Sequence, residues 1–457
     1  MPNHIHREQI EAAVKGHNAD YVEVRVEANE STRVAYRGRD LDDIGQTTNL
    51  GGCARVCVKG GWGFITFNKL DDLRAKVDLA VQQARLVGNE KTDLGEVKPV
   101  VDIVKPHIVK DPRPIPLSKK KEYLDQYNDI IWRTPQIQTS SLRYGDTHKH
   151  VVFASSVGSY IEQERIDIVI GLAVMARDGS DVQQANLSHG TLGDFSLIEG
   201  LHQEVEDTAK RAVAFLTAPY AKGGEYTVVL DPILGGVFTH EAFGHLSEAD
   251  FIYENDRMKD IMVLGKRFGG KHLNIVDGAA VGGLRGSFKY DDEGVEAQRT
   301  YLIREGELVG RLHSRETAAK LGEKPTGNAR AMDFHFPPIV RMTNTFIEPT
   351  KTPAKDIFAD VKEGVYCKNW YGGMTSMEMF TFSAGEAYMI RNGKVEELMR
   401  PVVLSGNLFE TLHNLDAVGD DLDMNQGGGC GKGGQFPLPV SNGAPHIRIQ
   451  KCLLGGK

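Results

Sequence analysis

The segment HEAFGHLSEAD at 240–250 constrains this chain most, because it sets His240, Glu241 and His245 within six positions. Zinc proteases commonly use H-E-x-x-H, in which both imidazoles share one helix face and the glutamate takes a proton from a water that the metal activates. Here the histidines are five residues apart instead of four. On a regular α-helix the second imidazole would point roughly 140° from the first, too far for both to reach one ion.

The surrounding residues favour a helix that carries both histidines. The apolar strand YTVVL at 226–230 precedes it, Asp231 is a good N-cap, and Pro232 suits the first helical position. The spacing then leaves two interpretations. One is an ordinary helix with two partly buried histidines, and the other is a helix with one extra residue in that turn, a π-bulge, which tends to occur at functional sites. Gly244, directly before His245, would ease such a distortion.

Other residues of this helix suggest what surrounds it. Gly235 and Gly236 are poor helix formers, by up to about 1 kcal/mol each relative to alanine, so they indicate that another backbone packs closely there. Glu248 and Asp250 follow the second histidine. One of these carboxylates could hold an imidazole N–H, and an exposed acidic helix end is the alternative.

A catalytic zinc usually has three protein ligands and a water, so two histidines make an incomplete site. Candidates for the third ligand include the other histidines, many carboxylates and five cysteines. Cys430 stands out in NQGGGCGKGGQ at 425–435, since its glycines allow close approach to another group. A solvent-exposed glycine loop with an incidental cysteine is the alternative. A phosphate-binding loop is excluded, because Gln426 replaces the required upstream glycine and Gly433 follows Lys432 where Ser or Thr is needed.

Several motifs in a fixed order resemble the TldD branch of the TldD/PmbA (TldE) metalloprotease family. They are HEAFGHLSEAD at 240–250, DDEGV at 291–295 followed by QRTYLI, TGNAR at 326–330 leading to PPIVRMTN at 337–344, and GGGCGKGGQ at 427–435, with GGCARVCVKGGWGF at 51–64 as a less specific match. The resemblance implies that His240, His245 and Cys430 are zinc ligands and that Glu241 is the general base. The partner branch lacks H-E-x-x-x-H, so the motif marks this chain as the metal-bearing subunit.

The resemblance also implies a function. It predicts a zinc-dependent peptidase that cleaves unfolded or leader-bearing peptides, held as an added strand inside a dimeric chamber, either as a homodimer or with a TldE/PmbA-like subunit. Two other classes stay open: a metal-dependent hydrolase of a non-peptide amide or ester, and a non-enzymatic regulatory interaction protein with a relict site. Glu241 argues against the last class, because a structural zinc needs no proton acceptor beside it.

Composition narrows the partners and the location. The 457 residues are 40% hydrophobic and 25% charged, which is ordinary for a soluble globular protein. A net charge of −8 provides no basic surface for direct nucleic-acid binding. No apolar run is long enough for a membrane helix, and MPNHIHREQI lacks a signal peptide's apolar core, so we expect a cytoplasmic protein. Cysteines other than Cys430 are expected to be structural, namely Cys53, Cys57, Cys367 and Cys452.

The pattern of elements predicts an α+β chain. We expect an N-terminal α/β domain at 1–218 and a mostly antiparallel β C-terminal domain at 225–457 that carries the metal-binding helix. Predicted N-terminal helices are 7–15, 73–84, 119–132 capped by Ser118, and 197–216, and predicted strands are 21–28, 32–36, 41–46 and 54–58 with glycine-pair turns. Predicted C-terminal helices are the metal helix, 315–321 and 354–358. The glycine pairs 51–52, 282–283 and 372–373 are either turns or room beside a bound peptide.

Overall fold

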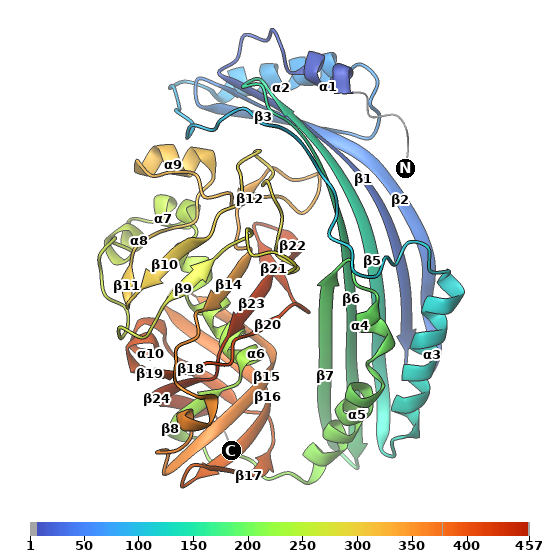
Figure 1. Ribbon diagram of the computed structural model, residues 1–457, viewed down its shortest axis with the longest axis vertical. Helices are drawn as coiled ribbons and strands as arrows, with labels where there is room; N and C mark the ends of the chain where they lie inside the picture. The colour runs from blue at the N-terminus through green and yellow to red at the C-terminus, as the bar shows by residue number, and fades with distance from the viewer. Residues whose placement is uncertain (1–6, 377, 456–457) are drawn as a thin grey trace.

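The structure is a computed structural model that describes residues 7–376 and 378–455. Long N-terminal strands form a curved sheet along one side and across the top of the molecule, and the C-terminal part packs inside the curve (Figure 1). The chain is α+β with a β-rich C-terminal part, so the predicted fold class is confirmed. The predicted domain boundary at 219–224 stays a prediction.

The N-terminal sheet has the order β3-β2-β1-β5-β6-β4, with β7 also paired to β6. Neighbouring strands are antiparallel except β4 and β6. The strands are β1 (Tyr21–Arg37), β2 (Asp40–Val58), β3 (Gly61–Phe67), β4 (Val101–Val104), β5 (Ile137–Ser155), β6 (Tyr160–Asp178) and β7 (Asp181–Leu192). The helices are α1 (Arg7–Ala13), α2 (Leu73–Val87), α3 (Leu117–Arg133), α4 (Ser196–Glu199) and α5 (His202–Thr217). Helices α1 and α2 bury their apolar faces at one end of the sheet, and α3 to α5 do so at the other.

Several predicted elements differ in extent. Strands 21–28 and 32–36 are one strand, β1, and 41–46 and 54–58 are both within β2. Gly51 and Gly52 therefore lie inside a strand and form no turn. A Cβ atom on Gly51 would lie 2.3 Å from the ring of Phe334, so this glycine makes room for a C-terminal loop. Helix 197–216 is interrupted after Glu199, and α3 is capped by Pro116, not Ser118.

Strand β1 shows how the two halves of the chain join. Its alternating sequence predicts a half-buried strand, and this is wrong, because the charged face is buried too: Glu23, Arg25 and Glu27 are 4%, 2% and 0% exposed. Arg25 donates hydrogen bonds to the backbone oxygens of Asp333 and Phe336 at 3.0 and 3.2 Å. The C-terminal loop at 331–336 thus covers the face that the alternation assigns to solvent.

Within the described residues of the C-terminal part there are two larger sheets and two short two-stranded ones. The first sheet has the order β15-β8-β24-β18-β16-β17 with β19 on β24, and the second has the order β11-β10-β9-β14-β23-β20. Pairing is antiparallel except for β8 with β15 and β14 with β23. The strands are β8 (Gly224–Leu230), β9 (Ile275–Asp277), β10 (Thr300–Arg304), β11 (Glu307–Leu308), β12 (Ala329–Arg330), β13 (Ile339–Val340), β14 (Asn344–Ile347), β15 (Glu363–Ser376), β16 (Met379–Arg391), β17 (Lys394–Met399), β18 (Val403–Asn407), β19 (Leu415–Val418), β20 (Asp423–Asn425), β21 (Gly429–Lys432), β22 (Gln435–Pro439), β23 (Ser441–Ala444) and β24 (Ile447–Gly455).

The helices of this part are short and lie around the sheets. They are α6 (Pro232–Thr239), a π-turn (His240–Gly244), a 3₁₀ turn (His245–Ser247), α7 (Ala249–Glu254), α8 (Asp256–Ile261), α9 (Arg315–Leu321), a second 3₁₀ turn (Ala354–Ile357) and α10 (Leu408–Asn414). Helix α9 has the predicted bounds, whereas α7, α8 and α10 were not predicted. The apolar residues of α6 enter the main C-terminal core, which places the candidate metal helix among the sheets.

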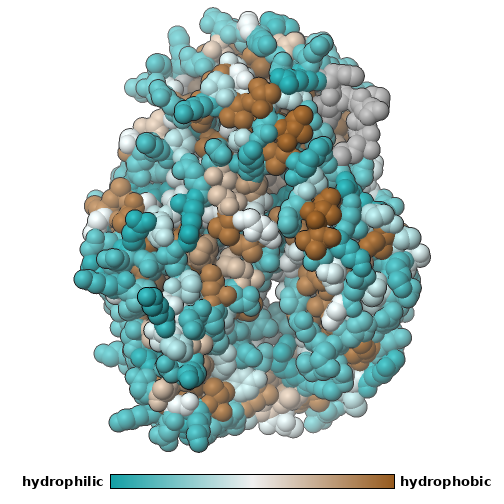
Figure 2. Space-filling model, in the orientation of Figure 1, coloured by the Kyte–Doolittle hydropathy of each residue, from teal (hydrophilic) through white to brown (hydrophobic). Residues whose placement is uncertain are grey.

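Figure 2 shows hydrophilic residues over most of one face, with hydrophobic residues in small separate patches. Within residues 7–376 and 378–455, no helix is long and apolar enough to cross a membrane. The five cysteines are buried and free, which agrees with the packing role predicted for four of them.

Candidate metal centre

The two histidines occupy a helix with a π-turn between them. Helix α6 begins as predicted, since the Oδ1 atom of Asp231 accepts a hydrogen bond of 2.8 Å from the N–H of Leu234 and Pro232 follows the cap. At its end, the N–H of His245 donates to the carbonyl of His240, five residues back. The extra residue brings the two ring centroids to 5.2 Å. The π-bulge predicted from the five-residue spacing is confirmed.

Glycines let this helix pack tightly. A Cβ on Gly236 would lie 2.6 Å from the backbone nitrogen of Gly443, which confirms the close backbone approach predicted for the glycine pair. Gly244 has an ordinary helical φ of −58°. A Cβ there would lie 2.0 Å from the sulfur of Met342. Gly244 is thus needed for space beside Met342, and conformational freedom is not the reason.

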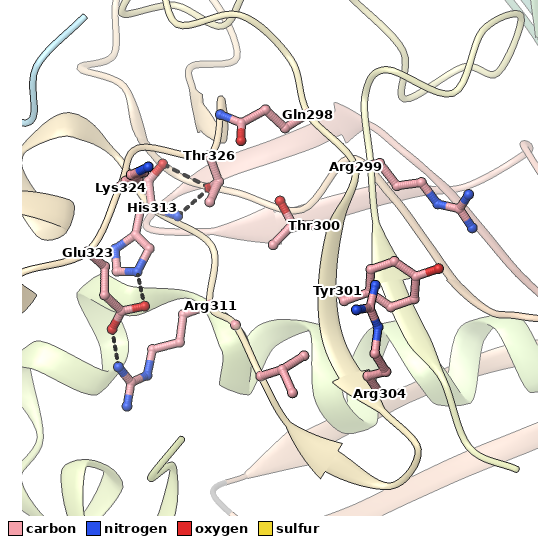
Figure 3. Close-up of a pocket in the computed structure, with 12 residues that line it drawn as sticks. Gln298, Arg299, Thr300, Tyr301, Arg304, Arg311, His313, Glu323, Lys324 and Thr326 are labelled. Atoms are coloured by element: carbon pink, nitrogen blue, oxygen red, sulfur yellow. Dashed lines mark hydrogen bonds and ion pairs between the residues drawn. The ribbon is translucent and has the colours of Figure 1, made fainter. Parts of the chain in front are cut away.

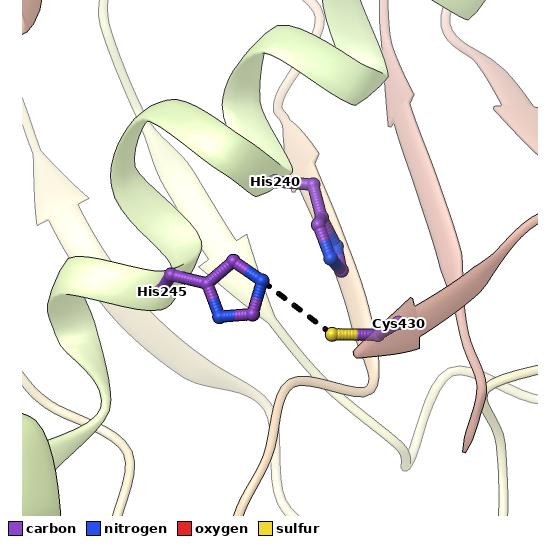
Figure 4. Close-up of side chains that lie close together, drawn as sticks. All are labelled: His240, His245 and Cys430. Atoms are coloured by element: carbon purple, nitrogen blue, oxygen red, sulfur yellow. Dashed lines mark hydrogen bonds between the residues drawn. The ribbon is translucent and has the colours of Figure 1, made fainter. Parts of the chain in front are cut away.

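Cys430 joins the histidines from a distant part of the chain. Its ligand atom and those of His240 and His245 all lie within 4.8 Å of one another. The Sγ atom is 3.5 Å from the Nε2 atom of His245, and both imidazoles point toward the thiol (Figure 4). Cys430 is 2% exposed on β21, so the exposed-loop alternative is wrong.

The residues present fit a zinc ion. Two imidazoles and a thiol are ligands that zinc prefers. The buried Nδ1 atom of His240 has no hydrogen-bond partner among the described residues, which a bound ion or water would correct. Burial alone would raise the pKa of the Cys430 thiol, but His240 and His245 outweigh it and lower that pKa well below its usual value. A thiol that ionises readily is prepared to coordinate a metal.

Glu248 holds the imidazole of His245. Its Oε2 atom lies 3.1 Å from the Nδ1 atom of His245, which donates, and its Oε1 atom accepts from the N–H of Met342 at 3.2 Å. One of the two acidic residues therefore holds an imidazole N–H, and the exposed-helix-end alternative is wrong for Glu248, which is 1% exposed. Burial raises the pKa of this carboxyl, but Lys432 and His245 outweigh it and bring the pKa to about 2. The contact leaves the Nε2 atom of His245 directed at Cys430.

Two arginines that sequence reasoning missed hold the segment around Cys430. The Nη2 atom of Arg341, in a fully buried side chain, donates to the carbonyl of Cys430 at 2.7 Å. Arg285 donates to the carbonyls of Gln426 and Gly428 at 3.0 and 2.6 Å. Arg341 belongs to the motif PPIVRMTN, so the only signal in the sequence was its place in that motif.

Glu241 is half-buried directly beside the first histidine. Within the part of the chain that the structure describes, its carboxylate has no hydrogen-bond or ion-pair partner, and it is not a member of the ligand cluster. The structure thus brings together His240, His245 and Cys430, and Glu241, the residue after His240, has no side-chain partner among the described residues. A free carboxylate at this place is suited to accept a proton.

A separate pocket of about 360 Å³ lies beside β10. Figure 3 shows Glu323 bonded to His313 and Arg311 on one side of it, and Arg299, Tyr301 and Arg304 on the other. None of its lining residues belongs to the ligand cluster. The candidate chemistry is therefore at the histidine helix and not in this pocket.

Comparisons with known proteins find relatives over almost the whole length of this chain. A metalloprotease from Synechocystis sp. is 48% identical over 440 residues, covering 96% of this chain and 95% of the relative. A zinc metalloprotease TldD homolog from Saccharolobus solfataricus is 31% identical over 441 residues, covering 96% of each chain. The structure of TldE from Thermococcus kodakarensis has the same fold, with a TM-score of 0.74, 16% identity, and coverage of 96% of this chain and 97% of that one.

Three family models match along the chain. They describe PmbA/TldA metallopeptidase domain 1 at 22–85, the central domain at 110–217 and the C-terminal domain at 223–456. The class of protein is therefore a metallopeptidase. The chain belongs to the PmbA/TldD metallopeptidase family, as the ordered motifs predicted.

Proposed function

We propose that this protein is a zinc-dependent peptidase whose ligands are His240, His245 and Cys430 and whose general base is Glu241. The observation that carries the proposal is the cluster of three candidate ligand atoms within 4.8 Å, two of them on the helix in which Glu241 directly follows His240. The relative from Saccharolobus solfataricus, named a zinc metalloprotease, supports the choice of metal. Two imidazoles and a thiolate are suited to zinc in particular, because they combine nitrogen and sulfur ligands.

The residues of the site divide the chemistry among them. When bound, zinc lowers the pKa of a coordinated water from about 15.7 toward about 7. Glu241 takes the proton of the attacking water and passes it to the leaving amine. Glu248 fixes the ring of His245, so that its other nitrogen faces the site. Cys430 adds the negative charge of a thiolate, which would make a bound zinc less electrophilic than three histidines would. Such a site fits a selective peptidase better than a digestive one.

The substrate we propose is an unfolded or leader-bearing peptide, cleaved in a chamber that two subunits form. The second subunit is either another copy of this chain or a TldE/PmbA-like protein, and the shared fold with TldE supports an assembly of this kind. Main-chain hydrogen bonds to an added strand would bind such peptides with little dependence on sequence. The net charge of −8 supports an enzyme without direct nucleic-acid contacts, and the compartment we propose is the cytoplasm.

The test is the hydrolysis of unfolded casein by the wild type, Glu241→Gln and the control Glu254→Gln. Glu254 lies exposed at the end of α7, so its replacement should leave activity unchanged. Glu241→Gln should keep its zinc and lose a factor of about 10² to 10⁴ in rate. Zinc loss in Glu241→Gln would instead indicate a coordinating carboxylate. A zinc-loaded wild type that cleaves esters but no peptide would contradict the peptidase proposal, and one that cleaves neither would indicate a regulatory protein.

A further inference from the structure

We propose that Lys432, with Glu248, is a positioning residue that ties the helix of His245 to the strand of Cys430 and thereby sets the strength of metal binding. The inference rests on the proposed zinc site and concerns two residues outside its ligand set. Lys432 lies in the glycine-rich segment at 425–435, and sequence reasoning assigned this lysine no role of its own once a phosphate-binding loop was excluded. The structure places its ammonium group between the two halves of the site.

The contacts of Lys432 account for its whole donor capacity. Its Nζ atom lies 3.0 Å from the Oε2 atom of Glu248 and donates to Asp250 Oδ1 at 2.6 Å and to the carbonyl of Val340 at 2.9 Å. An ammonium group has three protons, and three acceptors surround it. The same Oε2 atom of Glu248 accepts the Nδ1 proton of His245. One carboxylate oxygen therefore links the lysine to the imidazole.

The position of Lys432 on its strand explains why this link reaches Cys430. Lys432 lies two residues after Cys430 on β21, where the pairing with β22 shifts register, and the burial still alternates: Cys430 is buried, Gly431 is exposed and Lys432 is again largely covered. Fixing the side chain of Lys432 thus fixes the face on which the Sγ atom of Cys430 lies. Lys432 therefore holds β21 at the end of the helix that carries His240 and His245. Cys430 and His245 are 185 residues apart in the chain.

Charge gives the second part of the argument. The carboxylate of Glu248 is buried, and Lys432 is the cationic partner that the structure gives it beside the N–H of His245. Removing one partner of a buried ion pair leaves an uncompensated charge, whereas removing both partners is much less harmful. Loss of Lys432 alone should therefore disturb the site more than loss of Lys432 together with the charge of Glu248.

The experiment compares K432M, E248Q and the double variant in the full-length protein. Zinc affinity is measured by competition with a chelator, and the sulfur-to-cobalt charge-transfer absorption of the cobalt-loaded protein reports the position of Cys430. We expect K432M and E248Q to weaken zinc binding about 10- to 100-fold and to reduce the cobalt absorption. The double variant should bind zinc more tightly than K432M.

The control is K120M, which breaks a matched buried pair in the N-terminal part. The Nζ atom of Lys120 lies 2.6 Å from Asp146 Oδ2, and both side chains are buried. K120M should lower the free energy of unfolding and leave zinc affinity unchanged.

The proposal would be overturned if K432M bound zinc as tightly as the wild type while losing as much stability as K120M. The proposed function would remain intact in that case. If K432M does not fold, the isosteric E248Q decides by the same criterion. A wild type that binds neither zinc nor cobalt would contradict the zinc site itself, and both proposals would then fall.

Discussion

The two sides of the candidate metal centre are built in different ways. The histidine side is local: the cap at Asp231, the π-turn and the contact between His245 and Glu248 all lie within one stretch of 18 residues, 231–248. The cysteine side depends on residues far away in the chain, since Arg341 holds the carbonyl of Cys430. Local hydrogen bonding can therefore place two of the candidate ligands, whereas the third depends on the completed fold.

The support of the cysteine side extends into the N-terminal sheet. Asp167 on β6 receives hydrogen bonds from the Nε and Nη2 atoms of Arg285 at 2.9 and 3.0 Å, and Arg285 in turn holds Gln426 and Gly428. The hydroxyl of Ser188 on β7 donates to the carbonyl of Gly427 at 2.8 Å. The loop before Cys430 is thus fixed by strands that no sequence window around Cys430 contains. Three predictions, in order of expected effect on zinc binding, test this difference.

Arg341→Met should have the largest effect. It removes the donors to the carbonyls of Cys430 and Gln435, and an unsatisfied buried polar group costs about 1 to 3 kcal/mol. We expect the free energy of unfolding to fall by a few kcal/mol and zinc affinity to fall by more than tenfold. Chemical denaturation and chelator competition measure the two quantities.

The matched control for this change is Arg400→Met. Arg400 also donates to backbone carbonyls, those of Ala218 and Leu216, but lies away from the ligand cluster. The Arg400→Met variant should have a lower free energy of unfolding than the wild type and the same zinc affinity. Equal zinc affinity in both arginine variants would mean that the cysteine side does not depend on distant support.

Asp167→Asn should have an intermediate effect. The change removes the negative charge that orients Arg285, and we expect zinc binding to weaken by about 0.5 to 2 kcal/mol, transmitted through the loop at 426–428. Calorimetric zinc titration of the variant measures it. Asp146→Asn breaks an ion pair on the neighbouring strand β5 and should leave the titration unchanged. A shift of the same size in both variants would point to general loosening of the sheet.

The difference between local and long-range support also explains which features the sequence could predict. Counting residues between His240 and His245 made a π-turn one of two interpretations, because helix geometry is local. The contacts of Lys432 and Arg341 could not be derived, since their acceptors lie far along the chain from them. The prediction for β1 failed for this reason too: the alternation in that strand was read correctly, but the loop that buries Arg25 is more than 300 residues away.

One missed element did have a local signal. Helix α10 begins after Asn407, whose Oδ1 atom accepts from the N–H of Phe409, and it buries Leu408 and Leu412, four residues apart. This cap and spacing are typical of a helix, but seven residues among strands gave too short a pattern to separate from its surroundings. The residues alone thus marked His240 and His245 as a candidate metal-binding pair, whereas their assignment as ligands, and that of Cys430, rested on the resemblance to a known family.

Asp231→Asn should have the smallest effect on zinc binding, because the cap of the histidine helix is local and asparagine keeps the oxygen that accepts from Leu234. Burial raises the pKa of the Asp231 carboxyl from 3.8 to about 6. Between about pH 4 and pH 6 the folded protein therefore binds a proton that the unfolded chain has released, so this group favours folding below pH 4 and loses that contribution as pH rises through 6. The free energy of unfolding of the apo protein, kept in chelator and measured by denaturation between about pH 4 and pH 6, should contain a decline with rising pH that Asp231→Asn lacks. The zinc affinity of this variant at about pH 7 should equal that of the wild type. A tenfold weaker zinc site in Asp231→Asn, or an unchanged pH profile, would show that the histidine side is not the local structure described.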